Sequence, residues 1–414
     1  MRIRFCHRLK AILATSGHSH PLRRVRTRAL PFVFAVFACL TLNSLAAGYD
    51  VAVYVWPAYH PEPRWAELGI FADGKGEWQS VYEAKPKRPG HCQPLVPYWG
   101  YEHDDDPKAL ARQIDAALAA GISVFVYDWY WYKGRPFLEN ALNNGFLKAP
   151  NSERMKFAIM YANHDVDSRW DNKAADLGPV IWKAAVTLDE FKRLCDRWVE
   201  RYFTRPNYFR IDGRLVFSFY QFNTYVKGVG GEEKAKDGIA YLREAVRKAG
   251  LGELHLQLLW HQNGDPAEHI RTYGFDSVSM YNWTSGNNFF SEKDAAQVRA
   301  EGVFPYMKWA DAVCGAWEQF AHLSVPFYPT VSLGYDDNPR FPPQKWTDVM
   351  TSATPQEFEA VVRRAKAFAD SNIPDGRQKV IYLNAWNEWT EGAMLQPDGR
   401  YGYGYLNALS RIFK

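Results

Sequence analysis

The sequence alternates between short apolar segments and amphipathic segments, and this alternation limits the folds open to it. Eight segments are rich in Val, Ile, Leu and aromatic residues, as buried strands are. Most are separated by helical patterns, one of which begins at Asp106 with Pro107 in its first turn. The expected strands lie within residues 50–56, 121–130, 155–163, 214–220, 253–260, 275–281, 325–334 and 378–389.

Eight strand–helix units predict an α/β fold, a (β/α)₈ TIM barrel with long loops at its C-terminal face. Residues 47–414 contain no low-complexity linker, charge block or internal repeat, so we expect one domain. No glycine-rich nucleotide loop follows the first strand, which disfavours a doubly wound sheet. In barrel enzymes the carboxyl ends of the strands meet at one mouth, where the chemistry takes place.

Polar and aromatic side chains stand at or near these predicted strand ends. Aromatic residues make up 16% of the chain, and surplus Trp and Tyr suit a ligand with apolar faces and hydroxyl edges, such as a sugar. We also expect Trp56, Asp165, Tyr220, His261, Tyr335 and Asn384 at the mouth. The predicted substrate-binding residues are Tyr59, His60, Glu77, Trp78, Asp128, Trp129, Tyr161, Asn163, His164, Trp260, Tyr281, Asp336, Trp386, Asn387 and Trp389.

Two glutamates, Glu388 and Glu391, follow the last predicted strand in "NAWNEWTEG". Three-residue spacing across one helical turn places both side chains on one side. Two nearby carboxylates repel, so one tends to keep a proton and can act as a general acid while the other stays ionised. Trp386 and Trp389 flank the pair and are expected to strengthen that difference. We therefore predict that Glu388 and Glu391 are the catalytic residues; a capping acid beside a solvated glutamate is the alternative.

Other acidic segments leave two interpretations open. Glu77 is either a substrate contact or an ordinary turn residue, and the segment 127–132, "YDWYWY", is either a stacking platform with Asp128 or packing at the rim. Neighbouring His164 and Asp165 point to different sides, so no metal is expected there. In "GYDDNPR", Asp336, Asp337 and Asn338 offer oxygen ligands for Ca²⁺, but a self-capped Asx-turn is favoured. The sequence predicts neither a metal nor a cofactor.

The first 46 residues differ from the rest in charge. They hold eight of the chain's 50 Lys and Arg and no acid, which leaves 42 basic against 46 acidic residues afterwards. The basic balance therefore gives no reason to expect a nucleic-acid partner. Arg23–Arg28, the apolar run 29–42 and small residues ending at Ala46 predict a signal peptide at residues 1–46. The run is shorter than the roughly 20 residues of a membrane-spanning helix.

We accordingly expect an exported chain, periplasmic or extracellular, with no membrane segment after cleavage. It is expected to be a monomer. Cys92, Cys195 and Cys314 lie beyond the leader, at spacings that allow one disulfide but no metal finger.

Several motifs together resemble the family 99-like glycoside hydrolase domain, also called WbsX-like, a distant relative of the family 99 endo-α-mannosidases. They are "VWPAYHPEP", "GEW", "KPKRPGHCQP", "GISVFVYDWYWYKG", "DGRLVFSFY" and "NAWNEWTEG…DGRYGYGYL". The resemblance covers nearly all of residues 50–412. It implies a (β/α)₈ barrel that cleaves α-linked poly- or oligosaccharides with retention of configuration.

The resemblance also implies roles for the two glutamates. Glu388 would deprotonate the sugar's 2-hydroxyl, giving a 1,2-anhydro-sugar, and Glu391 would act as general acid and then as base. One departure stands out: "YANHDVDSRW" replaces the "WANE" of common WbsX-like members. The leading hypothesis is an exported glycosidase that degrades polysaccharide. The alternatives are a glycosyltransferase or polysaccharide-assembly protein, and a glycan-binding barrel without catalysis.

Overall fold

The computed structural model describes residues 48–71, 74–167, 179–260, 264–284 and 289–414. Residues 46–414 form one compact unit. The expected signal peptide at residues 1–46 lies outside the described residues, and so does His261.

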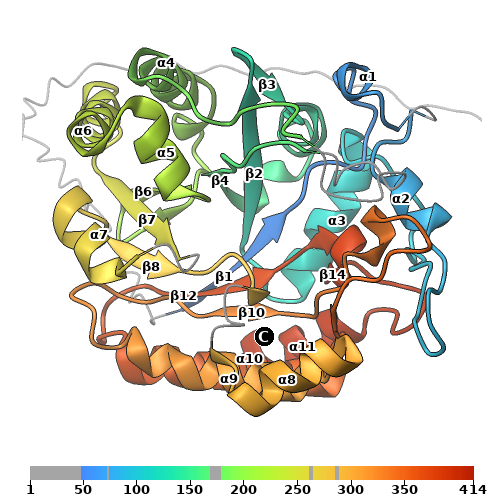
Figure 1. Ribbon diagram of the computed structural model, residues 1–414. Helices are drawn as coiled ribbons and strands as arrows, with labels where there is room; N and C mark the ends of the chain where they lie inside the picture. Colours follow the sequence, from blue (N-terminus) through green and yellow to red (C-terminus); the bar gives the residue numbers. More distant parts are fainter. Residues whose placement is uncertain (1–47, 72–73, 168–178, 261–263, 285–288) are drawn as a thin grey trace, which may run out of the picture. The chain divides into compact units, whose positions relative to one another are not determined.

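Within the described residues, eight parallel strands form a nearly closed barrel, which confirms the predicted fold (Figure 1). Around the barrel their order is β10, β12, β1, β2, β4, β6, β7 and β8, and a parallel bridge from Val278 to Phe327 joins the last to the segment before β10. The barrel strands are β1 (Tyr49–Val55), β2 (Val124–Tyr132), β4 (Lys156–Tyr161), β6 (Arg214–Phe219), β7 (Leu254–Leu259), β8 (Ser277–Ser279), β10 (Thr330–Ser332) and β12 (Lys379–Asn384).

Helices surround this sheet on its outer face (Figure 1). Some of them begin at a capping side chain: Asp106 accepts from the backbone N–H of Lys108, and Thr354 forms a reciprocal capping box with Glu357. The α-helices are α1 (Trp65–Leu68), α2 (Trp78–Glu83), α3 (Pro107–Ala119), α4 (Leu188–Trp198), α5 (Phe222–Val229), α6 (Glu232–Lys248), α7 (Pro266–Tyr273), α8 (Glu292–Glu301), α9 (Tyr306–Ala316), α10 (Pro355–Asn372) and α11 (Gly404–Phe413).

Short strands and single helical turns lie in the loops between the main elements. Small strands are β3 (Arg135–Phe137), β5 (Arg210–Ile211), β9 (Val303–Phe304), β11 (Val349–Met350), β13 (Asn387–Glu388) and β14 (Ala393–Met394). Single turns of 3₁₀-helix span Ser152–Arg154, Trp317–Gln319, Asn338–Arg340 and Trp389–Glu391, and π-helical turns span Ala141–Phe146 and Val199–Phe203.

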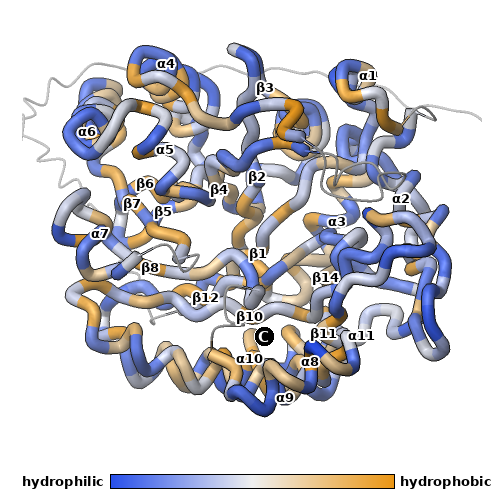
Figure 2. The backbone as a smooth tube through the Cα atoms, viewed as in Figure 1, coloured by the Kyte–Doolittle hydropathy of each residue, from blue (hydrophilic) through white to orange (hydrophobic). Residues whose placement is uncertain are grey.

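The core lies inside the barrel and between the sheet and its helices. Val53 on β1 pairs with Leu383 on β12 and with Phe125 on β2, and all three are fully buried. Hydrophobic residues, coloured orange, accordingly recur along the central strands in Figure 2. Because a parallel barrel covers both faces of each strand, these strands carry apolar residues almost without alternation.

Two long connections bring side chains to the mouth of the barrel. The connection from β1 to α3 carries Glu77, and the connection from β10 to α10 carries Arg340. No helix among the described residues is both long enough and apolar enough to cross a membrane.

Candidate active site

The carboxyl ends of the strands surround a cavity of about 250 Å³. Five of the predicted site residues line it: Asp128, His164, Tyr281, Glu388 and Glu391. Aromatic side chains form much of the remaining wall, and amides and a hydroxyl complete it. These further lining residues include Trp56, Tyr130, Tyr220, Gln221, Asn282, Thr284, Tyr335, Asp337, Arg340 and Phe341.

Glu388 and Glu391 reach this cavity from a tight turn. Glu388 closes the two-residue strand β13, and Glu391 ends the 3₁₀ turn that follows it. Gly392 then adopts φ of +64°, a left-handed conformation that most residues avoid, and the chain reverses into β14. The three-residue spacing thus places both carboxyl groups on one wall.

Asn387 ties this turn to the first barrel strand. Its side-chain oxygen accepts from the backbone N–H of Trp56 at 2.8 Å, and its side-chain nitrogen donates to the Trp56 carbonyl at 2.7 Å. Asn387 therefore positions Glu388 and does not line the cavity.

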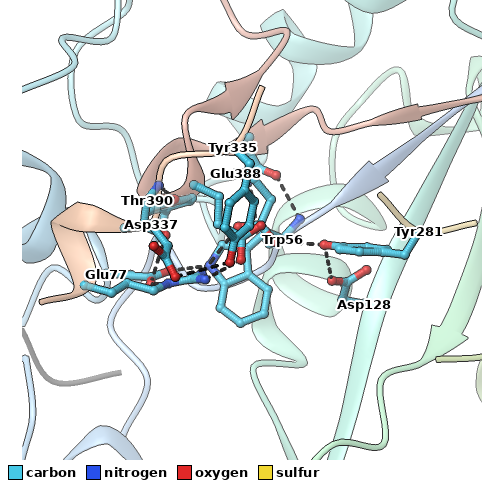
Figure 3. A network of polar contacts seen from close by, with 12 residues as sticks. Trp56, Glu77, Asp128, Tyr281, Tyr335, Asp337, Glu388 and Thr390 are labelled. Carbon is cyan, nitrogen blue, oxygen red and sulfur yellow. Dashed lines mark hydrogen bonds and ion pairs between the residues drawn. The ribbon is translucent and has the colours of Figure 1, made fainter. Parts of the chain in front are cut away.

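Arg340 connects three glutamates at the base of the site. Its guanidinium donates to Glu77 at 2.9 Å, to Glu391 at 2.5 Å and to Glu388 at 3.4 Å. The cation also lies 5.5 Å from the centre of the Trp56 ring. Glu77 accepts further bonds from the Trp56 indole and from the Thr390 hydroxyl, the latter at 3.0 Å. Figure 3 shows Glu77, Trp56 and Thr390 within this network.

Tyr281 connects Glu388 to a fourth carboxyl group. Its hydroxyl oxygen lies 2.8 Å from Glu388 Oε1 and 3.0 Å from Asp128 Oδ2 (Figure 3). Asp128 comes from β2 and Tyr281 follows β8, and these two strands are distant from each other around the barrel. Their side chains therefore converge on Glu388, which follows the last barrel strand.

Burial perturbs both glutamates of the pair. Desolvation raises the pKa of Glu388 well above its usual value, and the nearby Glu391 raises it further. Arg340 acts in the opposite direction and lowers this pKa. Desolvation likewise raises the pKa of Glu391, although Arg340 favours its ionised form. Glu391 Oε1 binds Arg340, whereas Oε2 is buried without a hydrogen-bond partner among the described residues. Oε2 is thus the position where a proton can face the cavity.

Several predicted residues lie behind the cavity instead of lining it. Tyr59, Trp78 and Trp389 form one aromatic cluster, with ring centres 4.2 Å and 5.7 Å apart in succession. The Trp386 indole donates to Gln113 on α3 at 2.8 Å. The two tryptophans that flank the acids in sequence therefore pack away from the cavity, because neighbours in a tight turn point in different directions. Neither tryptophan lines the cavity, and a contact of either one with substrate stays a prediction.

Other predicted residues serve the outer layers of the barrel. Trp129 and Tyr161 both pack on Trp198 of α4, with ring centres 5.3 Å apart in each pair. Outward positions on a barrel strand face the helices, which explains why these two rings are not in the cavity. Trp260 stacks on Phe289 and lines a separate small hollow.

Three polar predicted residues are also away from the cavity wall. His60 is fully buried, and burial together with His103 lowers its pKa to about 3, so it is uncharged at neutral pH. Asn163 exchanges two hydrogen bonds with the backbone of Gln221. Asp336 caps its own turn by accepting from the backbone and side chain of Asn338, and it accepts from Gln93 and contacts His91 on its other oxygen.

The Asp336 turn is therefore self-capped, as the sequence favours.

No group of three His, Cys, Asp or Glu suited to a metal occurs in the described parts of the chain. Cys92, Cys195 and Cys314 are free thiols, so the disulfide that the sequence allows is not formed among them.

Sequence reasoning missed Arg340, the cation at the centre of the site. It lies in the "GYDDNPR" segment, directly after the acids that drew attention to that turn. The available signal was a lone arginine in the loop after the seventh barrel strand, facing a mouth rich in predicted acids.

The position of this loop depends on a second cation that was also missed. The Lys87 ammonium donates to the carbonyls of Asn338, Phe341 and Lys345 at 2.7, 3.0 and 2.7 Å. Lys87 thereby binds the backbone on both sides of Arg340 in this segment.

Comparisons with known proteins agree with this architecture. A family model described as glycosyltransferase WbsX matches residues 51–409. Two curated relatives, both called uncharacterized protein WxcX, come from Xanthomonas campestris pv. campestris strains B100 and ATCC 33913. Each is 27% identical to this chain, over 363 and 362 residues, which is 86% of this chain and 48% of the relative. The chain thus spans about half the length of the curated relatives it matches.

Two solved structures share the fold. A glycoside hydrolase-like protein has a TM-score of 0.57 at 16% identity, covering 89% of this chain and 95% of the other. A family 99 endo-α-mannosidase from Bacteroides thetaiotaomicron has a TM-score of 0.52 at 16% identity, covering 88% and 95%. At these identities the likeness concerns the fold alone.

Proposed function

We propose that this chain, which belongs to the family described as glycosyltransferase WbsX, is a glycoside hydrolase acting on α-linked poly- or oligosaccharides with retention of configuration. One observation carries the proposal: two carboxyl groups, the buried Glu388 and the largely buried Glu391, line the same aromatic-walled cavity. Hydrolysis of a glycosidic bond needs a proton donor and a carboxylate placed together in this way. The fold shared with a family 99 enzyme supports the same choice.

The proposed reaction assigns a different task to each acid. Glu388, as a carboxylate, takes the proton of the 2-hydroxyl while that oxygen attacks C1, and Glu391 gives its proton to the departing oxygen as the C1–O bond breaks. Water then attacks C1 of the 1,2-anhydro-sugar and loses a proton to Glu391, while Glu388 returns its proton to O2. The unpartnered Glu391 Oε2 supports the donor role.

The family description raises transfer from a nucleotide sugar as the second candidate. The charged residues lining the cavity are Asp128, Asp337, Glu388 and Glu391 with the single Arg340, apart from His164. Arg340 already contacts two of these acids. Even with Asp128 and Glu391 protonated, Asp337 and Glu388 outnumber the single Arg340, so the cavity favours a neutral sugar over a diphosphate. A glycan-binding barrel without catalysis would have no use for the paired acids.

Product analysis separates these functions. Purified protein is incubated with a panel of polysaccharides, with and without nucleotide sugars, and the products are identified by mass spectrometry. We expect shortened chains without a nucleotide sugar. Chain extension that depends on one would establish the transferase, and binding without products would establish the third candidate.

Variants of the two acids test their roles. Glu388→Gln and Glu391→Gln should each lose about 10²–10⁴-fold in kcat, while the exposed Glu318→Gln serves as the control. A substrate with an activated leaving group should partly rescue Glu391→Gln alone, because its departing oxygen needs no proton. Normal cleavage of a 2-deoxy substrate would rule out attack by the 2-hydroxyl.

We also propose export, which rests on the positive and apolar character of residues 23–46. Amino-terminal sequencing of protein from the native host should find a chain that begins near residue 47. A cytoplasmic chain that retains residues 1–46 would contradict export without affecting the catalytic proposal.

A further inference from the structure

The contacts of Tyr281 constrain where one proton of the site resides. A phenol has one hydrogen to donate, and an ionised carboxylate has none. The Tyr281 oxygen nevertheless lies within hydrogen-bond distance of both Asp128 and Glu388. If both acids were ionised, one of these contacts would bring two oxygens together without a hydrogen between them. Both contacts become full two-centre hydrogen bonds when one of the two carboxyl groups holds a proton and donates it to Tyr281, whereas a single shared phenolic hydrogen gives two weaker bonds.

The surroundings of the two acids show which one this is. Glu388 Oε2 lies 3.4 Å from the Arg340 guanidinium, which favours the ionised form against the burial that raises the pKa of Glu388. Asp128 is 5% exposed and forms no ion pair with any described residue. Its Oδ1 is buried without a hydrogen-bond partner among the described residues. An ionised carboxylate without a cation is costly to bury, so the proton belongs on Asp128.

We propose that Asp128 is held as an uncharged carboxylic acid in the free protein and acts through Tyr281 as a positioning residue for Glu388. Asp128 donates to the Tyr281 oxygen, and Tyr281 then has its own hydrogen available for Glu388. That bond stabilises Glu388 as the carboxylate that accepts a substrate proton. The positioning part rests on the proposed function, whereas the protonation state of Asp128 does not.

The remaining charged and titratable groups around Asp128 agree with this assignment. Burial raises the pKa of Asp128 well above its usual value against the Tyr281 bond, and ionisation of the nearby Glu391 would raise it further. The neighbouring phenols Tyr54 and Tyr130 are buried and neutral, and their pKa values are raised by burial. His164 lines the same cavity, where its ring contacts the Asp165 carbonyl and the Tyr130 hydroxyl. An uncharged Asp128 is also a poor nucleophile, which argues against direct attack by this residue on a sugar.

Infrared difference spectroscopy tests the protonation state without any substrate. The carbonyl band of protonated carboxyl groups is compared at neutral pH between the full protein and Asp128→Asn. We expect the substitution to remove intensity from that band. The exposed Asp311→Asn should remove only carboxylate intensity. Asp104 is another buried acid with a raised pKa, so Asp104→Asn provides a reference for the same band. Loss of carboxylate intensity in Asp128→Asn would overturn the proposal.

Activity then tests the positioning role separately. Asp128→Asn can still donate to Tyr281 through its amide and should lose less than about tenfold in kcat, whereas Asp128→Ala should lose about tenfold or more. Tyr281→Phe removes a bond to an ionised group and should lose about 10- to 100-fold. Because that bond favours ionised Glu388, Tyr281→Phe should also move the acidic limb of the pH profile to higher pH. Equal losses in the Asn and Ala variants, or an unmoved acidic limb, would refute positioning. An inactive wild type with the expected spectrum would refute only the proposed function.

Discussion

At the scale of single residues, the site depends on the balance between one buried cation and several buried acids. Arg340 pairs with Glu77, Glu388 and Glu391, whose side chains are 2%, 3% and 12% exposed, and is itself 11% exposed. Removing one partner from such a group leaves charge buried without compensation, which is far more costly than losing an exposed ion pair.

We therefore predict that Arg340→Met destabilises the protein by about 3–5 kcal/mol at neutral pH. Without the guanidinium, the pKa values of Glu388 and Glu391 rise further above those of the unfolded chain. The folded state then binds more protons than the unfolded state, so stability is present at low pH and is lost as pH rises through the raised values. Urea unfolding should accordingly show a smaller deficit at about pH 5 than at neutral pH.

The matched control for this prediction is Arg364→Met. Arg364 pairs with exposed Asp311, and loss of that pair should cost about 0–1 kcal/mol. A deficit in Arg340→Met that does not change with pH would show that packing, and not charge, accounts for the loss.

The same residues show how far sequence reasoning reached into the site. Asp128, His164, Tyr281 and the two glutamates could be placed because strand ends converge in a barrel. Arg340 could not, because its partners Glu77 and Glu391 are 263 and 51 positions away in the chain. Trp386 and Trp389 were misplaced because proximity to an acid in sequence says little about which way a side chain points in a turn.

At the scale of elements, the strands were predictable and the long connections were not. A buried parallel strand is recognised from its own composition, and each of the eight expected segments overlaps a barrel strand. The connection from β1 to α3 has no such local pattern, since its course depends on contacts with distant loops. It nevertheless supplies Glu77 and Lys87, which hold Arg340 and its loop.

Gly76 fixes the close approach of this connection to the end of β1. It adopts φ of +66°, and a Cβ at this position would lie 2.4 Å from the Ala58 carbonyl oxygen. We predict that Gly76→Ala costs more than about 1 kcal/mol in unfolding free energy and displaces neighbouring Glu77. Gly74 has φ of +74° with no atom within 4 Å of such a Cβ, so Gly74→Ala isolates backbone strain. If urea unfolding shows equal losses of unfolding free energy in Gly76→Ala and Gly74→Ala, the steric contribution at Gly76 is excluded.

Lys87 offers a test of the loop that holds Arg340. We predict that Lys87→Met lowers kcat by more than its effect on the melting temperature would suggest. The reason is that three carbonyl contacts at the ends of the Arg340 segment are lost. Exposed Lys85 on the same connection provides the control, Lys85→Met. Normal kcat with a large fall in melting temperature would instead make Lys87 a stabilising residue without influence on the site.

At the scale of the whole barrel, the cavity continues into a second hollow on its rim. His164 and Gln221 line both spaces, and the second is also lined by Thr224, Ala185 and Lys227. The cavity that holds the acidic pair has a volume of about 250 Å³, and the second hollow has a volume of about 550 Å³. The larger space therefore lies away from the two acids. A substrate with one sugar at Glu388 and Glu391 can extend past His164 into this hollow, which argues for an oligosaccharide over a monosaccharide derivative.

We predict that filling the outer hollow impairs only long substrates. In Ala185→Trp an indole would occupy the space where further sugar units would lie, and Ala185 lines only the outer hollow, whereas the two acids line only the inner cavity. Contacts with several sugar units add binding energy that a short aryl glycoside never uses, so kcat/KM should fall for oligosaccharides and stay constant for the aryl glycoside. Exposed Ala249→Trp, which lies at the end of α6, controls for a surface tryptophan. Equal kcat/KM for both substrate lengths in Ala185→Trp would mean that the chain leaves the cavity by another path.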